Sequence, residues 1–271
     1  LDISAHPFCG GVPQDVRITT RYNENDLLSA LFGVIHETGH ARYEQNLPRP
    51  WVDQPVGLAR STAIHESQSL FFEMQLARHP AFLRKMAPLI KQHFGEQPAL
   101  EAENLIQLYS RIEPGFIRVD ADELTYPAHI IMRFEIEQAL IEEKIQVRDL
   151  PEVWNTKMQQ YLGLSTKGND AIGCMQDIHW TDGSFGYFPS YTLGAIYAAQ
   201  FAGAIERDVG NIGELIAADD GLPQIFNWLK TNVWEKASLF STEELIQQAT
   251  GESLNTQWFR RYLEQRYTKA L

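Results

Sequence analysis

A His-Glu-x-x-His motif at residues 36–40 constrains the fold of this chain more than any other feature. Residues four apart lie on one face of an α-helix, so His36 and His40 can bind one metal ion only if this segment is helical. Glu37 would then lie beside the metal, where it can accept a proton from a metal-bound water. The motif therefore predicts a helix that carries the metal centre of a zinc peptidase.

The residues around the motif favour the same helix. Asn25 or Asp26 can cap its start, and Pro48 and Pro50 limit its length, so we expect it to end near Gln45. Apolar residues recur before the motif at helical spacing, namely Leu27, Leu28, Leu31, Phe32 and Ile35. The two histidines could instead be ordinary helix residues with local hydrogen bonds. The enclosed glutamate and a second His-Glu segment downstream favour the metal site.

The second His-Glu segment, His65-Glu66-Ser67-Gln68, lies in a predicted helix over residues 61–74 that ends before His79-Pro80. We expect Glu66 to be the third metal ligand. Glu73 lies two turns further on the same face. It is either a carboxylate that holds a histidine ligand by its outer nitrogen or a solvated charge. The expected core face of this helix consists of Ile64, Phe71, Phe72 and Leu76.

The rest of the chain predicts one mostly α domain over residues 1–271, a helical zinc-peptidase domain with a short strand or hairpin near its N-terminus. Residues 8–22 alternate polar and β-branched side chains and contain the breaks Gly10-Gly11 and Pro13, which suits a hairpin. Ser241 and Glu244 form a capping box for a helix that Gly251 ends. Other predicted helices span residues 99–112, 127–145, 151–163, 189–207 and 255–269.

Composition excludes several classes of function. The net charge of −12 offers no basic stripe for nucleic acid, so we expect no nucleic-acid partner. No apolar run is long enough to cross a membrane, so we expect no membrane partner. The two cysteines, Cys9 and Cys174, do not form a disulfide framework, which indicates a reducing compartment and predicts a cytoplasmic protein.

Two stretches rich in polar residues, 117–126 and 173–191, predict loops that a helical scaffold would hold. From their composition alone, the aspartates Asp120, Asp122 and Asp177 are as well explained by caps and turns as by function.

Six motifs occur in a fixed order along the chain. They are His6-Pro7-Phe8, Asp-x-Arg-x-Thr at 15–19, His-Glu-x-x-His at 36–40, His-Glu-Ser-Gln at 65–68, Ile-Arg-x-x-Ala-Asp at 117–122 and Gly-x-x-Gln-Asp-x-His-Trp at 173–180. With them the chain resembles the carboxypeptidase Taq family, zinc-type metallocarboxypeptidases that remove C-terminal residues. The resemblance also implies a homodimer. Family members are longer, with a helical half before the His-Pro-Phe motif, so we expect a C-terminal catalytic part of a longer protein.

The resemblance and the residue patterns lead to the same expected metal centre. His36, His40 and Glu66 bind Zn²⁺, although a His-His-Glu site also accepts Co²⁺ or Mn²⁺. Glu37 is the general base. We expect His179 and Tyr191 to donate hydrogen bonds to the oxyanion, with Tyr187 behind them.

A carboxypeptidase must also bind the free C-terminal carboxylate of its peptide substrate, and arginine suits this because its planar fork grips a carboxylate with two hydrogen bonds. Arg118 is the first candidate, Arg17 the second and Arg21 a weaker third. Each could instead form a structural ion pair with a nearby aspartate such as Asp15 or Asp122. Gln176 is a further substrate-binding candidate, although it and Asp177 could order His179 instead.

Two alternatives stay open from the sequence. One is a zinc aminopeptidase or endopeptidase with the same metal ligands, in which Glu73, Asp120 or Asp122 would bind the substrate amine. The other is an inactive helical module that lacks the N-terminal half of the family.

Overall fold

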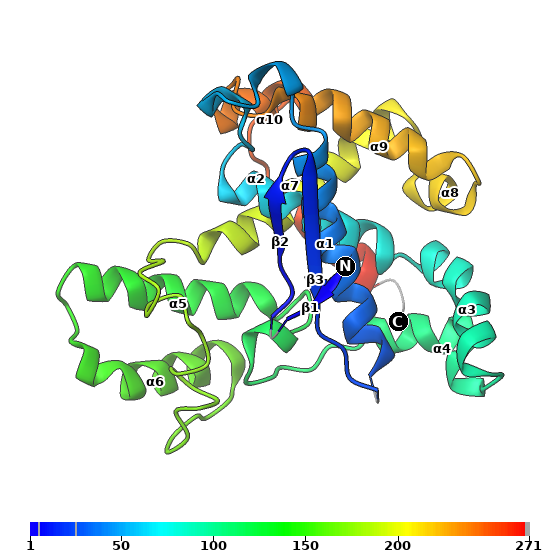
Figure 1. Cartoon of the computed structure of the whole chain (residues 1–271). Helices are drawn as coiled ribbons and strands as arrows, with labels where there is room; N and C mark the ends of the chain where they lie inside the picture. Colours follow the sequence, from blue (N-terminus) through cyan, green and yellow to red (C-terminus); the bar gives the residue numbers. More distant parts are fainter. Residues whose placement is uncertain (5, 25, 269–271) are drawn as a thin grey trace. The chain divides into compact units, whose positions relative to one another are not determined.

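The computed structural model describes residues 1–4, 6–24 and 26–268 of the chain. Two residues named in the predictions, Asn25 and Lys269, lie outside this range. The fold is mostly α with a small sheet near the N-terminus, which confirms the predicted fold class (Figure 1). Within the described residues, no helix has both the length and the apolar character that crossing a bilayer requires.

The chain divides into two compact units. The first unit contains Leu1–Ser110 and Gly194–Leu271, and the second contains Arg111–Leu193. The long helix α7, Pro189–Asp208, begins in the second unit and continues into the first. The single domain expected over residues 1–271 stays a prediction.

The first unit begins with a three-stranded sheet in the order β1-β3-β2. The predicted hairpin is confirmed, since β2 (Cys9–Val12) and β3 (Asp15–Thr20) pair antiparallel across a tight turn, with Val12 opposite Asp15. The strand β1, Asp2–Ile3, pairs parallel with β3 and was not predicted. The hairpin lies alongside the helix that carries the His-Glu-x-x-His motif, where β3 and β2 both contact α1 (Figure 1).

Helix α1, Leu27–Gln45, has the bounds that the sequence predicts. Asp26 caps its start by accepting a hydrogen bond from the backbone N–H of Ser29. Asn46 is its C-cap, and the proline-containing turn begins two residues later. The buried residues of the helix are Phe32, Glu37, Gly39, Ala41 and Tyr43.

Helix α2, Thr62–Leu70, continues without a break into a π-helical segment, Phe71–Ala77. The predicted helix is present and its four expected core residues are buried, but it runs three residues further than residue 74, with wider turns. The backbone N–H of Arg78 donates to the carbonyl of Glu73, five residues back, as this geometry requires. Segments of this kind are rare and often occur at functional sites.

The further helices of the first unit are α3 (Pro80–Phe94), α4 (Ala102–Tyr109), α8 (Ile212–Ala217), α9 (Gly221–Asn232), α10 (Thr242–Thr250) and α11 (Gln257–Tyr267). One core cluster of this unit includes Met74 from the π-helical segment, Ala195, Ile196 and Ala199 from α7, and Phe259 from α11. Helix α4 is shorter than the predicted 99–112 because residue Glu101 is extended and separates it from a 3-10 turn at Pro98–Leu100.

The second unit is built on two helices, α5 (Tyr126–Ile141) and α6 (Leu150–Leu162), which pack through Met132, Ile136, Trp154 and Met158. Helix α5 ends before the predicted residue 145, since Glu143 adopts a left-handed backbone conformation with φ of 57°. The segment between α6 and α7 contains no helix or strand. Further 3-10 turns lie at Arg49–Trp51, Pro55–Gly57, Arg118–Asp120, Val147–Asp149 and Trp234–Lys236.

The close approach of α1 and α2 depends on Gly39. A Cβ atom at this position would lie 2.4 Å from the carbonyl oxygen of Gln68 and 2.5 Å from the Cα of Ser69, both on α2. Any larger residue therefore pushes the two helices apart. Gly33, on the same helix, has open surroundings, because its Cβ would meet nothing closer than Pro7 Cγ at 3.6 Å.

We expect Gly39→Ala to lower the free energy of unfolding by about 1–3 kcal/mol through this overlap. The matched variant Gly33→Ala should leave the stability unchanged or raise it by up to about 1 kcal/mol, because alanine favours helix over glycine. Urea unfolding of the three proteins measures both effects. Equal stability of Gly39→Ala and the wild type would contradict the close packing described here.

Candidate metal centre and active site

Three side chains of the first unit converge on one point. His36 Nε2 lies 3.6 Å from Glu66 Oε1, and His40 Nε2 lies 3.7 Å from Glu66 Oε2. The ligand atoms of the three residues all lie within 4.8 Å of one another. Two of them come from α1 and the third from α2, so the contact between these helices assembles the group.

The outer nitrogens of both histidines are held by other groups. His36 Nδ1 lies 2.9 Å from Glu73 Oε2, and Arg78 donates to the other oxygen of the same carboxylate at 2.8 Å. His40 Nδ1 lies 3.1 Å from the backbone carbonyl of His65. An acceptor at Nδ1 fixes the proton there and leaves Nε2 with a free lone pair. Of the two interpretations of Glu73, the structure therefore favours the carboxylate that holds a histidine.

This arrangement fits a divalent metal ion. Two nitrogen lone pairs and a carboxylate face each other at distances longer than a hydrogen bond, and such a group repels itself unless a cation lies between its members. Two imidazole nitrogens and one carboxylate oxygen are also the ligand types of a catalytic zinc site. His36, His40 and Glu66 are thus the residues that would hold the ion.

The charges around the group favour a cation as well. Burial by itself lowers the pKa of His36, but the Glu73 hydrogen bond and the Glu66 and Glu37 carboxylates outweigh it and raise the pKa to about 9. Burial holds the pKa of His40 well below its ordinary value. A metal ion needs both imidazoles neutral. The carboxylates that stabilise a proton on His36 are the same negative charges that attract a metal ion.

Glu37 follows His36 on α1 and is only 6% exposed. Its carboxylate makes no hydrogen bond and no ion pair with any residue that the structure describes. Burial raises its pKa, His36 lowers it and Glu66 raises it again, with a net upward shift. A carboxylate with a raised pKa and no committed partner is suited to accept a proton.

Neighbouring residues support the three ligands. The ring of His65 stacks on that of His40 with centroids 4.5 Å apart, and its Nε2 contacts Glu44 at 2.7 Å. Gly194 lies against Glu66, since a Cβ there would come within 2.9 Å of Glu66 Cγ. The glutamine of the His-Glu-Ser-Gln motif, Gln68, accepts a hydrogen bond from Trp234 and so secures α2.

The second unit contains a buried ionic network centred on Asp177. Arg118 donates to Asp177 Oδ1 through Nε at 2.9 Å, and Arg133 donates to Asp177 Oδ2 at 2.6 Å. Arg118 also donates to the Tyr126 hydroxyl at 2.7 Å. Burial lowers the pKa of Arg118, but Tyr126 and Asp177 raise it overall, so the guanidinium stays charged. Two positive charges therefore share one negative charge.

His179 and Tyr191 are brought together in the same unit. His179 Nε2 lies 3.0 Å from the Tyr191 hydroxyl, and the imidazole stacks on Phe188 with centroids 4.2 Å apart. Burial, and then the charge of Arg118, lower the pKa of His179, which favours its neutral form. Tyr187 completes the cluster, with its ring centroid 5.7 Å from that of His179.

Arg17 and Gln176 have protein partners of their own. Arg17 lies on β3, exposed, and donates to Asp15 through Nη2 at 2.8 Å, so the predicted ion-pair alternative for Arg17 is present. The side-chain oxygen of Gln176 accepts from the backbone N–H of Arg118 at 2.8 Å and from Arg133 at 2.9 Å. Gln176 thus orders the arginines. Asp177 Oδ1 and His179 Nδ1 are 3.9 Å apart, too far for a hydrogen bond.

The aspartate of the Ile-Arg-x-x-Ala-Asp motif, Asp122, is a turn residue. It accepts from the backbone N–H groups of Glu113, Leu124 and Thr125. Arg118 pairs with Asp177, whereas the ion-pair alternative considered from the sequence named Asp15 or Asp122 as its partner.

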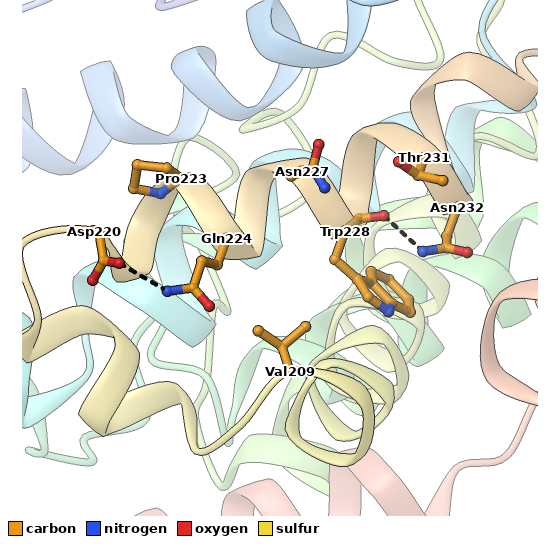
Figure 2. A pocket seen from close by; sticks show the side chains of 8 residues that line it. All are labelled: Val209, Asp220, Pro223, Gln224, Asn227, Trp228, Thr231 and Asn232. Atoms are coloured by element: carbon orange, nitrogen blue, oxygen red, sulfur yellow. Dashed lines mark hydrogen bonds between the residues drawn. The ribbon is translucent and has the colours of Figure 1, made fainter.

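A groove of about 620 Å³ in the first unit contains none of the predicted site residues (Figure 2). It runs along α9, where Trp228 and Asn227 face it and Gln224 contacts Asp220 at 3.4 Å. Asp220 is its one acidic or basic side chain, so it offers no set of groups for metal binding or acid–base chemistry.

Comparison with known proteins decides the family. Residues 1–267 match the model of the family described as carboxypeptidase Taq (M32) metallopeptidase. The chain belongs to this family. Carboxypeptidase 1 of Bacillus subtilis is 41% identical over 99% of this chain, and thermostable carboxypeptidase 1 of Thermus thermophilus is 40% identical over 98% of it.

Solved structures of the family agree with the fold. Metallocarboxypeptidase 1 of Trypanosoma cruzi superposes with a TM-score of 0.95 at 49% identity, over 98% of this chain and 56% of that chain. The M32 carboxypeptidase of Deinococcus radiodurans gives a TM-score of 0.94 at 36% identity, over 99% of this chain and 54% of that one.

The chain spans about half the length of the curated relatives that it matches, 54% of the Bacillus subtilis protein and 52% of the Thermus thermophilus protein. The family resemblance predicted from the six motifs is confirmed. Membership in a metallopeptidase family implies a divalent metal ion, in agreement with the donor set of His36, His40 and Glu66. The roles of the individual residues stay predictions.

Three residues of the M32 chain were missed by sequence reasoning. Arg133 shares Asp177 with Arg118, Tyr126 accepts from Arg118, and Arg78 secures Glu73. A signal for Arg133 was available, because His129, Arg133 and Glu137 form a polar row at intervals of four beside the apolar residues Met132 and Ile136.

We expect Glu73→Gln to weaken zinc binding by the chain roughly 10- to 100-fold, because the amide holds the His36 imidazole less firmly and adds no negative charge. Titration against a chelator of known affinity measures the dissociation constant. Glu103→Gln is the matched control, since Glu103 forms an exposed ion pair with Arg84. Wild-type affinity in Glu73→Gln would show that the Glu73 contact does not tune the site.

Proposed function

We propose that this M32 chain hydrolyses the C-terminal peptide bond of peptides in a metal-dependent reaction. The observation that carries the proposal is the convergence of His36, His40 and Glu66 beside the uncommitted carboxylate of Glu37. The relatives named carboxypeptidase support the substrate class, peptides with a free C-terminal carboxylate.

We propose Zn²⁺ as the ion, with Co²⁺ and Mn²⁺ as alternatives, because two imidazoles and a carboxylate suit each of them. When bound, such an ion lowers the pKa of water to about 7 and polarises a carbonyl group. The chain's own contribution is to engage the Nδ1 atom of each histidine with an acceptor, so that Nε2 is the nitrogen each neutral imidazole presents to the ion.

Glu37 acts as the general base in this proposal. Its carboxylate accepts a proton from the attacking water and later delivers it to the leaving amine nitrogen. The raised pKa supports this role, because a more basic carboxylate accepts a proton more readily.

The network around Arg118 is proposed to bind the substrate carboxylate. Arg118 and Arg133 together carry one more positive charge than Asp177 neutralises, and both guanidinium groups are almost fully buried. A buried excess charge is costly, and an incoming carboxylate would compensate it. His179 and Tyr191 are proposed to donate hydrogen bonds to the oxyanion, with the neutral His179 oriented by its stacking on Phe188.

The aminopeptidase alternative is less well supported. It needs an acidic group for the substrate amine, but Glu73 is engaged by His36 and Arg78, and Asp122 accepts three backbone N–H groups. The homodimer also remains a proposal that rests on the family resemblance. The cytoplasmic location rests on the two unpaired cysteines, Cys9 and Cys174.

The proposal predicts the outcome of a test with two matched peptides and zinc-loaded protein. One peptide has a blocked amine and a free carboxylate, and the other has a free amine and an amidated end. We expect cleavage of the first alone, abolished by a chelator. Glu37→Gln should still bind zinc but lose roughly 100- to 10,000-fold in kcat. Cleavage of the second peptide alone would replace the proposal by an aminopeptidase, and cleavage of neither would contradict activity of this chain.

Arg118→Ala should raise KM for the free-acid peptide roughly 10- to 100-fold, because the variant loses a hydrogen bond to the charged carboxylate of the substrate. Arg17→Ala serves as the matched comparison, since Arg17 is the second candidate and already pairs with Asp15 on the surface. Steady-state kinetics of both variants discriminate between them. An unchanged KM in Arg118→Ala, with a raised KM in Arg17→Ala, would move the carboxylate site to Arg17.

A further inference from the structure

Helix α5 buries a row of polar side chains in addition to its apolar ones. His129, Arg133 and Glu137 follow each other at intervals of four, and their exposed fractions are 0%, 0% and 3%. Residues at this spacing lie on one face of a helix. Arg133 of this row belongs to the Asp177 network, and Glu137 lies one turn further along.

Glu137 contacts the segment that carries His179 at two points. Its Oε1 accepts a hydrogen bond from the indole N–H of Trp180 at 2.9 Å, and its Oε2 accepts one from the backbone N–H of Gly186 at 3.1 Å. Glu137 forms no ion pair with any of the residues that the structure describes. Burial raises its pKa, and the two hydrogen bonds lower it in part.

Burying a carboxylate without a cation beside it is costly, so the presence of Glu137 at this buried position needs a specific explanation. The two N–H groups that it accepts supply one. A carboxylate is the side chain that accepts hydrogen bonds on both of its oxygens, whereas an amide presents one acceptor and one donor. Glutamine in place of Glu137 would therefore leave Trp180 or Gly186 facing a second N–H donor. The two N–H groups therefore require a side chain with two acceptor oxygens, which is the ionised carboxylate of Glu137.

The backbone of His179 is thereby fixed on both sides. Asp177, two residues before it, is bound to Arg118 and Arg133. Trp180, the residue after it, is bound to Glu137. The second contact of Glu137, at Gly186, lies two residues before Phe188, the ring on which His179 stacks.

We propose that Glu137 is a positioning residue for His179, which it sets in its place beside Tyr191 by holding Trp180 and Gly186. This inference rests on the proposed function in one respect, the role of His179 in catalysis. Glu137 lies outside the six motifs and acts by accepting the N–H groups of Trp180 and Gly186.

The experiment compares Glu137→Gln with Glu135→Gln in the zinc-loaded full chain. Glu135 lies on the same helix, and its carboxylate binds Lys157 and Tyr161 of α6, so it controls for the loss of a charge on α5. The first measurement is the NMR signal of the His179 imidazole, labelled with ¹³C and assigned by comparison with His179→Gln. The second is kcat and KM for the free-acid peptide.

In Glu137→Gln we expect the His179 signal to shift or broaden and kcat to fall roughly 10- to 100-fold, the effect of a displacement of about 1 Å. KM should stay near its wild-type value, because Arg118 is held by Asp177. Glu135→Gln should match the wild type in both measurements. Trp180→Phe, which removes one of the two donors, should move the signal in the same direction, and the double variant should be no worse than Glu137→Gln alone.

An unchanged His179 signal in a folded Glu137→Gln protein would overturn the inference, even if its thermal stability falls. A wild-type chain without activity towards the free-acid peptide would instead refute the proposed function. The imidazole signal would still decide in that case whether Glu137 positions His179, so the two failures are distinguishable.

Discussion

The contact between α1 and α2 at Gly39 is the constraint on which the candidate metal centre depends. The motif on α1 carries two of the proposed ligands and α2 carries the third, so the three donors meet only if the helices approach closely. The absence of a Cβ at Gly39 permits this approach, and Gly194 lets α7 press against Glu66 from another direction. Both glycines therefore matter for the ligand geometry through the space they leave, and not through any chemistry of their own.

The main polar feature of the second unit is a buried ionic network of two arginines and one aspartate. Asp177 accepts from Arg118 and Arg133 at the same time, and Gln176 ties both arginines together through one oxygen. The chain as a whole carries a net charge of −12, yet this interior network has a positive excess. A long-range field would repel an anionic group from such a protein, so the carboxylate binding proposed above would depend on these local arginines.

Local patterns predicted the fold and the grouping of His36, His40 and Glu66 well, for physical reasons. Helix periodicity, the Asp26 cap and the prolines after Gln45 act within a few residues, so α1 was predicted with its true bounds. The partners of Arg118 were predicted less well, because Asp177 lies far along the chain and no local rule selects it over Asp122. The π-helical turns that place Glu73 beside His36 have no sequence signal of their own, and the only local signal of Glu137 is its spacing from His129 and Arg133.

The two units use carboxylates in the same way, to fix an imidazole that the proposed chemistry needs. Glu73 binds His36 directly and fixes the proton on Nδ1, whereas Glu137 acts one residue away, on Trp180. Glu73 has Arg78 as a counter-charge, but Glu137 has only two neutral N–H donors. Because a buried charge without a counter-ion is the more costly arrangement, replacement of Glu137 by an amide should harm the position of His179 more than it harms overall stability. A displaced His179 in a protein of nearly unchanged stability is the result that separates a positioning role of Glu137 from a merely structural one.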